Sequence, residues 1–244
     1  MAVMTTRVAS AKHVADNVIQ LRLVKPEGFT WKTGEFARVG LKIEGDEVFR
    51  AYSIGSSPAS ETVDFYIANV TGGILSPKLN QIKTGDSVLI DTEVGGMLLA
   101  DRLEAGGKDL WMFASGTGVS PFLAVLSDES ITSRFERLIL VHGVRTWNET
   151  GYVSRLVKRS PKLTVVACVT REKGAAVNER IPDALADGSL EKLAGITIEK
   201  EHSRVMLCGN PGMVKSVREA MKARGIVSPR GGKPGQLLAE NFWL

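Results

Sequence analysis

The pattern of apolar residues changes near residue 100, and no other feature of the sequence constrains the fold as strongly. Before this point, short segments in which apolar and polar residues partly alternate are separated by Gly and Pro, which is typical of strands in an antiparallel barrel or sandwich. These segments are residues 18–24, 37–43, 63–70 and 87–92. Residues 76–82, which open with Ser-Pro, are the only helix expected in this half.

After residue 108 the expected strands are mostly apolar and are separated by helical stretches. They are residues 110–114, 138–141, 163–169 and 205–208. Buried strands that alternate with helices indicate a doubly wound parallel α/β sheet. A chain of 244 residues suits two domains. We expect them at residues 1–102 and 103–244, with the paired glycines Gly106 and Gly107 in the connection.

Residues that could bind a metal or form disulfides are few. Cys168 and Cys208 are the only cysteines, too few for an iron–sulfur cluster or a disulfide framework. The three histidines are widely spaced, so we expect no metal site. Redox chemistry would then need an organic cofactor or a loosely ligated metal. No apolar run approaches the roughly 20 residues of a membrane span and no secretory signal is visible, so we expect a cytoplasmic protein.

Residues 211–235 form a basic segment with Glu219 as its single acid. Its basic residues are Lys215, Arg218, Lys222, Arg224, Arg230 and Lys233. The segment lacks aromatic residues on which bases could stack, so nucleic acid is not the expected partner. The charge fits an acidic protein partner, with simple solubility as the alternative explanation.

A glycine-rich turn follows the strand at residues 110–114. Residues 115–121 read Ser-Gly-Thr-Gly-Val-Ser-Pro, and a helix is expected to begin near Pro121. Glycines allow a ligand to approach the backbone, and the start of a helix presents free N–H groups to a phosphate. The segment lacks the full G-x-G-x-x-G pattern, so an ordinary strand-to-helix turn is an equal alternative.

Arginines follow the next two strands where NAD-binding folds carry an acid. Arg145 follows one strand, Arg171 follows the next, and Arg180 comes shortly after. An acid at this position grips the ribose hydroxyls, whereas arginine suits a 2′-phosphate. We expect the three side chains to converge on one phosphate; scattered surface arginines are the alternative.

In the first half, Arg50 and Tyr52 are two residues apart in an expected strand. The alternation of side chains places them on one face, with Ala51 and Ser53 on the other. A guanidinium beside an aromatic ring suits a ligand that has a pyrophosphate and a ring system, although both residue types are also common on solvated strand faces.

Taken together, five segments resemble the motifs of the bacterial ferredoxin (flavodoxin)–NADP reductases, in the same order along the whole chain. They are Arg50-Ala51-Tyr52-Ser53, Gly73-Ile74-Leu75-Ser76, Gly116-Thr117-Gly118-Val119-Ser120-Pro121, Cys208-Gly209-Asn210-Pro211 and Glu240-Asn241-Phe242-Trp243. The resemblance implies an antiparallel β-barrel that carries FAD, followed by an α/β domain that carries NADP(H) and ends in an aromatic tail returning to the flavin.

The resemblance also assigns roles to individual residues. FAD binding falls to Arg50, Ala51, Tyr52, Ser53, Tyr66, Ile74, Leu75, Ser76, Thr117, Phe242 and Trp243. NADP binding falls to Thr117, Gly143, Arg145, Thr170, Arg171, Arg180, Gly209, Asn210 and Pro211. The catalytic residues would be Ser53, near the flavin N5 that receives hydride, and Cys208 and Glu240, which would line the nicotinamide site. A carboxylate there could stabilise the cationic nicotinamide or relay protons.

The tail departs from the family pattern at two positions. Phe242 stands where relatives often carry Tyr, so its ring can stack but cannot donate a hydrogen bond. Leu244 follows Trp243, which ends the chain in several relatives, and this displaces the terminal carboxylate.

The expected activity is hydride exchange between NADP(H) and FAD, with single electrons passed to or from an acidic ferredoxin or flavodoxin. We expect that carrier to dock beside the basic helix at residues 211–224, and the protein to be a monomer. The alternatives are a free flavin reductase or an oxygenase reductase of the same fold, or a non-catalytic subunit that senses redox state. The cysteine count excludes a fused iron–sulfur domain.

Overall fold

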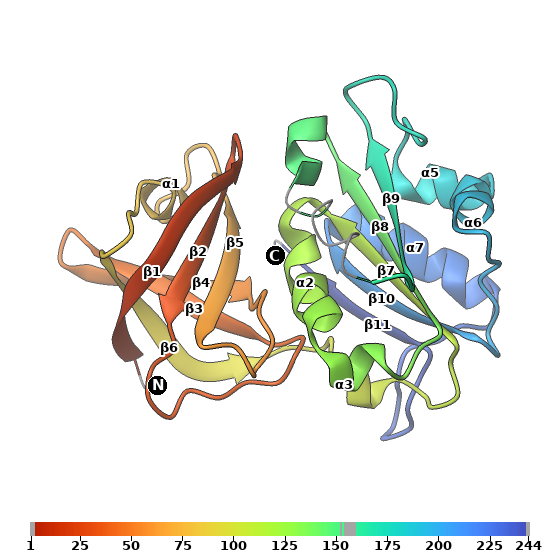
Figure 1. Cartoon of the computed structure of the whole chain (residues 1–244), viewed down its shortest axis with the longest axis horizontal. Coiled ribbons are helices and arrows are strands. Elements are labelled where there is room, and N and C mark those ends of the chain that lie inside the picture. The colour runs from red at the N-terminus through yellow and green to blue at the C-terminus, as the bar shows by residue number, and fades with distance from the viewer. Residues whose placement is uncertain (1–2, 152, 154–159, 243–244) are drawn as a thin grey trace.

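Two sheets divide the chain as the change of periodicity predicts. The computed structural model describes residues 3–151, 153 and 160–242. The N-terminal sheet lies beside an α/β unit, and each has its own apolar core (Figure 1). The expected combination of an antiparallel β domain with a parallel α/β domain is therefore confirmed.

Within the described residues, the first sheet has six antiparallel strands in the order β4-β3-β6-β1-β2-β5. The strands are β1 (Val3–Ala15), β2 (Val18–Val24), β3 (Phe36–Ile43), β4 (Asp46–Ser53), β5 (Thr62–Ala68) and β6 (Ser87–Gly95). The two edge strands meet where the Gly55 N–H donates to the Asp64 carbonyl at 2.7 Å, which curls the sheet toward a barrel. In β2, Leu21 and Leu23 are buried inside and Arg22 points out, as the alternation predicts.

Strand β1 was not expected from the sequence. Most of its side chains are exposed, so the apolar periodicity that reveals a strand is missing. Its backbone holds it in place, because it pairs with β2 along one edge and with β6 along the other. The expected helix at residues 76–82 is shorter, α1 (Ser76–Leu79), and the 3-10 turn η1 (Ala100–Arg102) is an addition.

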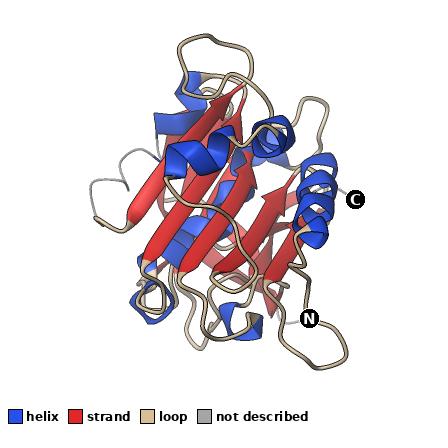
Figure 2. Ribbon diagram, turned by 90° about the vertical axis from the view of Figure 1, so that its right-hand side faces the viewer, coloured by secondary structure: helices blue, strands red, loops and turns tan. Residues whose placement is uncertain are grey.

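The second sheet is parallel, with the order β11-β10-β7-β8-β9 among the described residues. Figure 2 shows the α/β unit from the side turned away from the barrel, with helices in front of the strands. Its strands are β7 (Asp109–Ser115), β8 (Arg137–Val144), β9 (Leu163–Val169), β10 (Ser203–Gly209) and β11 (Leu237–Asn241). Its helices and 3-10 turns are η2 (Gly116–Val119), α2 (Ser120–Ser127), α3 (Glu129–Thr132), η3 (Trp147–Thr150), α5 (Ile181–Ala186), α6 (Ser189–Ala194) and α7 (Pro211–Ala223). The sequence did not indicate β11, a five-residue strand that pairs in parallel with β10.

Helices cover the two faces of this sheet separately. Leu110 and Met112 of β7 point to the face covered by α2, which is also the side of the barrel (Figure 1). Trp111 and Phe113 point to the opposite face, where α5, α6 and α7 pack. All four side chains are completely buried. Both sheet faces are therefore needed for the core, as in doubly wound folds.

The barrel and the α/β unit are in direct contact. Val14 and Tyr66 of the barrel pack against the core on the α2 side of the sheet. The Asp16 N–H donates to Asn148 Oδ1 at 2.7 Å, and Thr33 Oγ1 donates to Asp128 Oδ2 at 2.5 Å. In the part of the chain that the structure describes, no helix is long and apolar enough to cross a membrane.

Candidate functional site

The strand order places a crevice between β7 and β10. After β7 the chain adds β8 and β9 on one side of it, and it then adds β10 on the other side. Ligands of doubly wound sheets bind at such a reversal of strand order, beyond the carboxyl ends of the strands. The glycine loop follows β7 and Asn210 follows β10. The two segments are joined, because the Asn210 N–H donates to Ser115 Oγ at 2.8 Å.

Two glycines allow this close approach of backbones. Gly209 has φ +135°, a conformation that side-chain-bearing residues rarely adopt, and a Cβ there would collide with Ser115. A Cβ on Gly118 would collide with the Cys208 carbonyl. Asn210 then caps α7 by accepting from the N–H groups of Gly212 and Met213 at 2.9 and 3.3 Å. Pro211 is the first residue of that helix.

Beneath the glycine loop lies His142, a residue that the sequence analysis did not select. It is buried on β8, and its Nε2 is 2.9 Å from the Gly116 carbonyl oxygen. Burial lowers the pKa of the imidazole to about 4, so the ring is neutral near pH 7 and Nε2 can donate to that carbonyl. A histidine among apolar strand residues was the only signal that could have identified it.

A cleft of about 1170 Å³ opens in front of these loops. Most residues predicted to bind NADP line it, namely Thr117, Gly143, Arg145, Thr170, Arg171, Arg180 and Asn210. Gly209 and Pro211 flank Asn210 without lining the cleft. The three arginines that were expected to converge on one phosphate all line this cleft, and their joint binding of a phosphate stays a prediction.

Two of the three arginines are joined through their backbones. The Arg171 N–H donates to the Arg145 carbonyl at 2.9 Å, which extends the pairing of β8 and β9 beyond the strands. Among the described residues, no carboxylate forms an ion pair with Arg145, Arg171 or Arg180. The lining also contains three acids, Glu149, Glu179 and Asp183. The exposed guanidinium groups can bind an anion in the cleft.

The barrel closes the other side of this cleft. Asn17 and Val18 line it from the start of β2, and the segment after β5 adds Asn69, Val70 and Thr71. Loop asparagines and threonines carry no distinctive sequence signal, so sequence reasoning missed them. A ligand in the cleft would therefore contact both halves of the chain.

The four residues of the first motif lie at the end of β4. Arg50 and Ala51 are exposed, and Arg50 Nη1 donates to the Phe49 carbonyl at 2.7 Å. Tyr52 is half-buried against the barrel core, and burial raises the pKa of its phenol to about 12. Ser53 is only 4% exposed, and within the described residues its Oγ has no hydrogen-bond partner. A buried hydroxyl without a partner is costly unless a ligand satisfies it.

The second motif forms a tight turn before α1. Ser76 is buried, and its Oγ accepts from the Val70 N–H at 3.1 Å, which leaves the hydroxyl proton available to a ligand. Leu75 points into the barrel core, whereas Ile74 is exposed. The Tyr66 hydroxyl on β5 accepts a hydrogen bond from Gln20 Nε2 at 3.0 Å. The pKa of the Tyr66 phenol is raised to about 12, mainly by burial and to a lesser extent by the negative charge of Asp64.

Cys208 on β10 and Glu240 on β11 are register partners in the parallel pairing of these two neighbouring strands. Burial, and then the Glu240 carboxylate, raises the pKa of the Cys208 thiol well above its ordinary value, so the thiol stays neutral. Burial raises the pKa of Glu240 to about 7, although a hydrogen bond from the Met97 N–H opposes the shift. Glu240 Oε2 is buried without a hydrogen-bond partner among the described residues.

The start of the tail also reaches the cleft. Phe242 lines it, packs against the core on the α2 side, and donates its N–H to the Gly209 carbonyl at 2.8 Å. The expected contributions of Trp243 and Leu244 lie outside the described residues.

The expected docking of a carrier beside α7 stays a prediction, and the packing of the helix argues against it. This helix packs on the sheet face turned away from the barrel (Figure 1). Lys215, Arg218 and Lys222 lie on its exposed side, and Arg224 is paired with Glu191 at 2.7 Å. A carrier bound to these exposed side chains would lie on the side of the sheet opposite the barrel, although the first turns of α7 reach the cleft through Gly212, Met213 and Ser216. The sequence alone cannot reveal the sheet face on which α7 packs, because a pattern of charged residues does not specify it.

Comparison with known proteins agrees with this arrangement. The family model described as an oxidoreductase FAD-binding domain matches residues 5–97, and the one described as an oxidoreductase NAD-binding domain matches residues 112–219. The chain is 33% identical to the ferredoxin–NADP reductase of Pseudomonas aeruginosa, over 98% of this chain and 97% of the relative. It is 35% identical to the flavodoxin/ferredoxin–NADP reductase of Escherichia coli K12, over 98% of each.

A solved structure shows the same architecture over the full length. The ferredoxin–NADP⁺ reductase of Neisseria gonorrhoeae, with bound FAD and NADP, superimposes with a TM-score of 0.93 at 30% identity. The match covers 99% of both chains. The likeness therefore extends to both domains and to the cleft between them.

Proposed function

The chain belongs to the ferredoxin/flavodoxin–NADP reductase family and is an oxidoreductase that binds FAD and NADP(H); on this premise we propose which residues carry the reaction and which carrier takes part. The observation that supports the proposal most strongly is the cleft lined by both halves of the chain, with three arginines at its α/β side that form no ion pair among the described residues. We place the boundary between the FAD and NADP domains at residues 102 and 103.

The barrel residues fit FAD. The buried Ser53 hydroxyl, which has no partner in the part of the chain that the structure describes, is of the kind that a bound ring system would satisfy. Tyr52 offers a half-buried ring for stacking, and the exposed Arg50 can pair with the pyrophosphate. Ser76 and the backbone of the preceding turn would hold the phosphates from the other side. When bound, FAD supplies two-electron exchange with a nicotinamide and one-electron exchange with a carrier.

The α/β residues fit a nucleotide with a 2′-phosphate. Arg145 and Arg171 would bind this phosphate, and Arg180 would complete its coordination. The loop containing Thr117, and the backbone near Gly209 and Asn210, would hold the rest of the dinucleotide. We assign the nicotinamide end to Cys208 and Glu240, where the neutral thiol adds no charge and the carboxylate can offset the positive charge that develops on the ring.

Phe242 would lie against the flavin and yield its place to the nicotinamide. Its ring can stack but cannot form the hydrogen bond that a tyrosine would make. Its backbone remains fixed to Gly209, so the exchange would involve movement of the side chain.

The carrier that we propose is a small acidic ferredoxin or flavodoxin. This assignment rests on the names of full-length relatives in Pseudomonas aeruginosa and Escherichia coli. It is tested by reduction of purified ferredoxin and flavodoxin by NADPH, compared with reduction of free flavin under the same conditions. Efficient turnover of either carrier supports the proposal. Rapid reduction of free flavin with neither carrier reduced would instead indicate a flavin reductase.

A further inference from the structure

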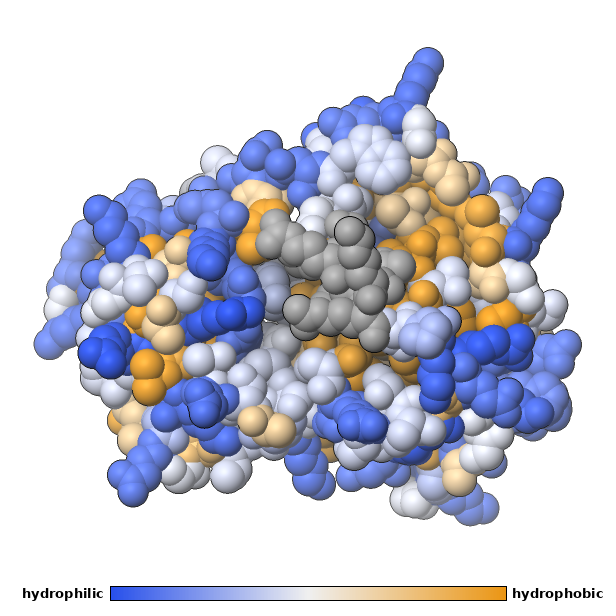
Figure 3. All heavy atoms as spheres, in the orientation of Figure 1, coloured by the Kyte–Doolittle hydropathy of each residue, from blue (hydrophilic) through white to orange (hydrophobic). Residues whose placement is uncertain are grey.

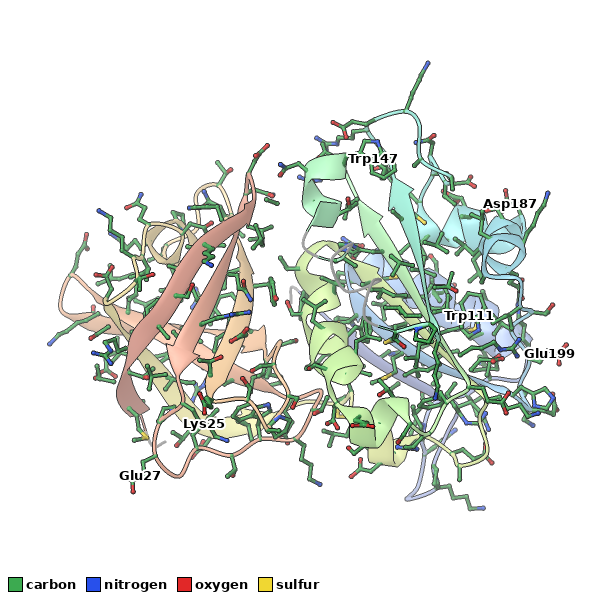
Figure 4. All side chains as sticks on the ribbon, viewed as in Figure 1. Lys25, Glu27, Trp111, Trp147, Asp187 and Glu199 are labelled. Atoms are coloured by element: carbon green, nitrogen blue, oxygen red, sulfur yellow. The ribbon has the colours of Figure 1, made fainter. Side chains whose placement is uncertain are left out.

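Among the three tryptophans that the structure describes, Trp147 lies at the surface, two residues after Arg145. Trp147 is 41% exposed, whereas Trp111 is completely buried and Trp31 is 6% exposed. Figure 4 places Trp147 at the end of the α/β domain where β8 and β9 terminate, far from Trp111 in the core. A large exposed aromatic side chain loses the free energy of burial that tryptophan usually contributes, so a ligand that covers it would recover that loss.

Although exposed, the indole is held in place. The Trp147 N–H donates to Glu172 Oε2 at 2.5 Å, and the indole Nε1–H donates to the Lys173 carbonyl at 3.3 Å. The loop that carries these acceptors is itself braced, because Asn178 Nδ2 donates to the Glu172 carbonyl at 2.7 Å. The hydrogen bond of the indole N–H lies near the plane of the ring, so it does not occupy a ring face. A ring that is ordered in advance loses little entropy when a ligand stacks on it.

The backbone directs Trp147 to the same side as Arg145. Thr146 lies between them in an extended conformation, with φ −132° and ψ 160°. Side chains on either side of an extended residue point in the same direction. In sequence, Trp147 also lies between Arg145 and Glu149, and both of these residues line the cleft. Trp147 is not among the described residues that line the cleft, so we place the indole at its rim.

On the premise of the proposed function, we infer that Trp147 stacks on the purine ring of NADP(H) and contributes to its binding. A phosphate held by Arg145 and Arg171 is attached to the adenosine ribose, so the ring nearest to it is adenine. The nicotinamide is assigned to the other end of the site, at Cys208 and Glu240.

The test is calorimetric titration of the FAD-loaded protein with adenosine 2′,5′-bisphosphate and with adenosine 5′-phosphate, neither of which can be oxidised or reduced. Trp147→Ala should raise Kd for both ligands about tenfold, which is about 1.4 kcal/mol and within the range for stacking of one base. Trp147→Phe should recover most of the affinity. Arg145→Ala should weaken only the bisphosphate. Leu193→Ala, a truncation of another exposed apolar side chain (44% exposed, on α6), should change neither Kd.

Each outcome decides the inference. If the wild-type protein does not bind the bisphosphate, the nucleotide site of the proposed function fails and the inference fails with it. If the wild-type protein binds and Trp147→Ala binds within twofold of it, only the stacking is refuted. Stacking is also refuted if Trp147→Phe is as weak as Trp147→Ala, because the loss would then come from the indole N–H and the loop it holds. Circular dichroism melting of each variant verifies that the fold is retained.

Discussion

Cys208 on β10 and Glu240 on β11 stand opposite each other in the parallel pairing of the two strands. Glu240 is the titrating member of the pair, since burial raises its pKa to about 7 while the thiol remains protonated. The carboxyl group can therefore change charge close to physiological pH. The hydrogen bond from the Met97 N–H ties it to the segment that leaves the barrel.

We predict that the rate of flavin reduction by NADPH rises with pH around 7 and that Glu240→Gln removes this dependence. Above pH 7 the ionised carboxylate stabilises the cationic nicotinamide, and below pH 7 the neutral acid cannot. Stopped-flow measurement from pH 5.5 to 9 checks this. A similar inflection in the Gln variant would assign the titration to another group.

The same shift predicts an effect on stability in the ligand-free protein. A carboxyl whose pKa is raised on folding favours the folded state most below its ordinary pKa of about 4.5 and loses that advantage as pH rises to about 7. Across this window the wild type should lose stability relative to Glu240→Gln, which does not ionise. Urea unfolding of both proteins at pH 4.5 and 7.5 measures the difference, and a gap that does not change with pH would contradict the raised pKa.

Ser53→Ala should separate stability from activity. The variant loses a buried hydroxyl that has no partner among the described residues, so the ligand-free protein should be about 1 kcal/mol more stable. Flavin reduction by NADPH should slow about tenfold, because one hydrogen bond to the reacting ring system is lost. Thermal unfolding and stopped-flow absorbance are the two measurements. A less stable variant would mean that Ser53 holds the barrel together.

Arg145→Ala and Arg171→Ala should each weaken NADPH binding by about 1.5–3 kcal/mol, as expected for a hydrogen bond to a charged group. The use of NADH, which lacks the 2′-phosphate, should barely change. Steady-state kinetics with both nucleotides provides the comparison. Equal losses with NADPH and NADH would show that these side chains support the loops rather than select the nucleotide.

The position of α7 predicts that reversing Lys215, Arg218 and Lys222 to Glu spares carrier reduction. These residues lie on the sheet face away from the barrel, and at physiological ionic strength charges are screened beyond about 8 Å. Rates with ferredoxin or flavodoxin should therefore stay within about twofold of the wild type at 0.15 M salt. A large, salt-sensitive loss would place the docking surface on α7 after all.

Much of this fold could be predicted because burial leaves a periodic trace. Strand β9 is apolar at every position except Thr164, and the expected residues 163–169 match it. Strand β1 could not be found, since its mostly exposed side chains show no such pattern and pairing with distant strands holds it in place. Local sequence carries no information about which partners a backbone will find.

The residues of the site, like the strands, could be predicted from the sequence only in part. Arg145 and Arg171 could be predicted because parallel strands end at one edge, so residues that follow neighbouring strands must meet. Asn17 and Asn69 reach the cleft only because the barrel docks against the α/β domain. Figure 3 shows hydrophilic side chains over the outer edges of both domains, so hydrophilic surface alone does not single out a docking position.

The central claim is that this protein holds FAD in the barrel and reduces it with NADPH from the neighbouring cleft. The most direct test is the visible spectrum of the purified protein, recorded without oxygen before and after one equivalent of NADPH. Our account predicts flavin absorbance equivalent to one FAD per chain, rapidly bleached by NADPH and much more slowly by NADH. Folded protein that binds no added FAD, or bound FAD that NADPH does not bleach, would contradict it.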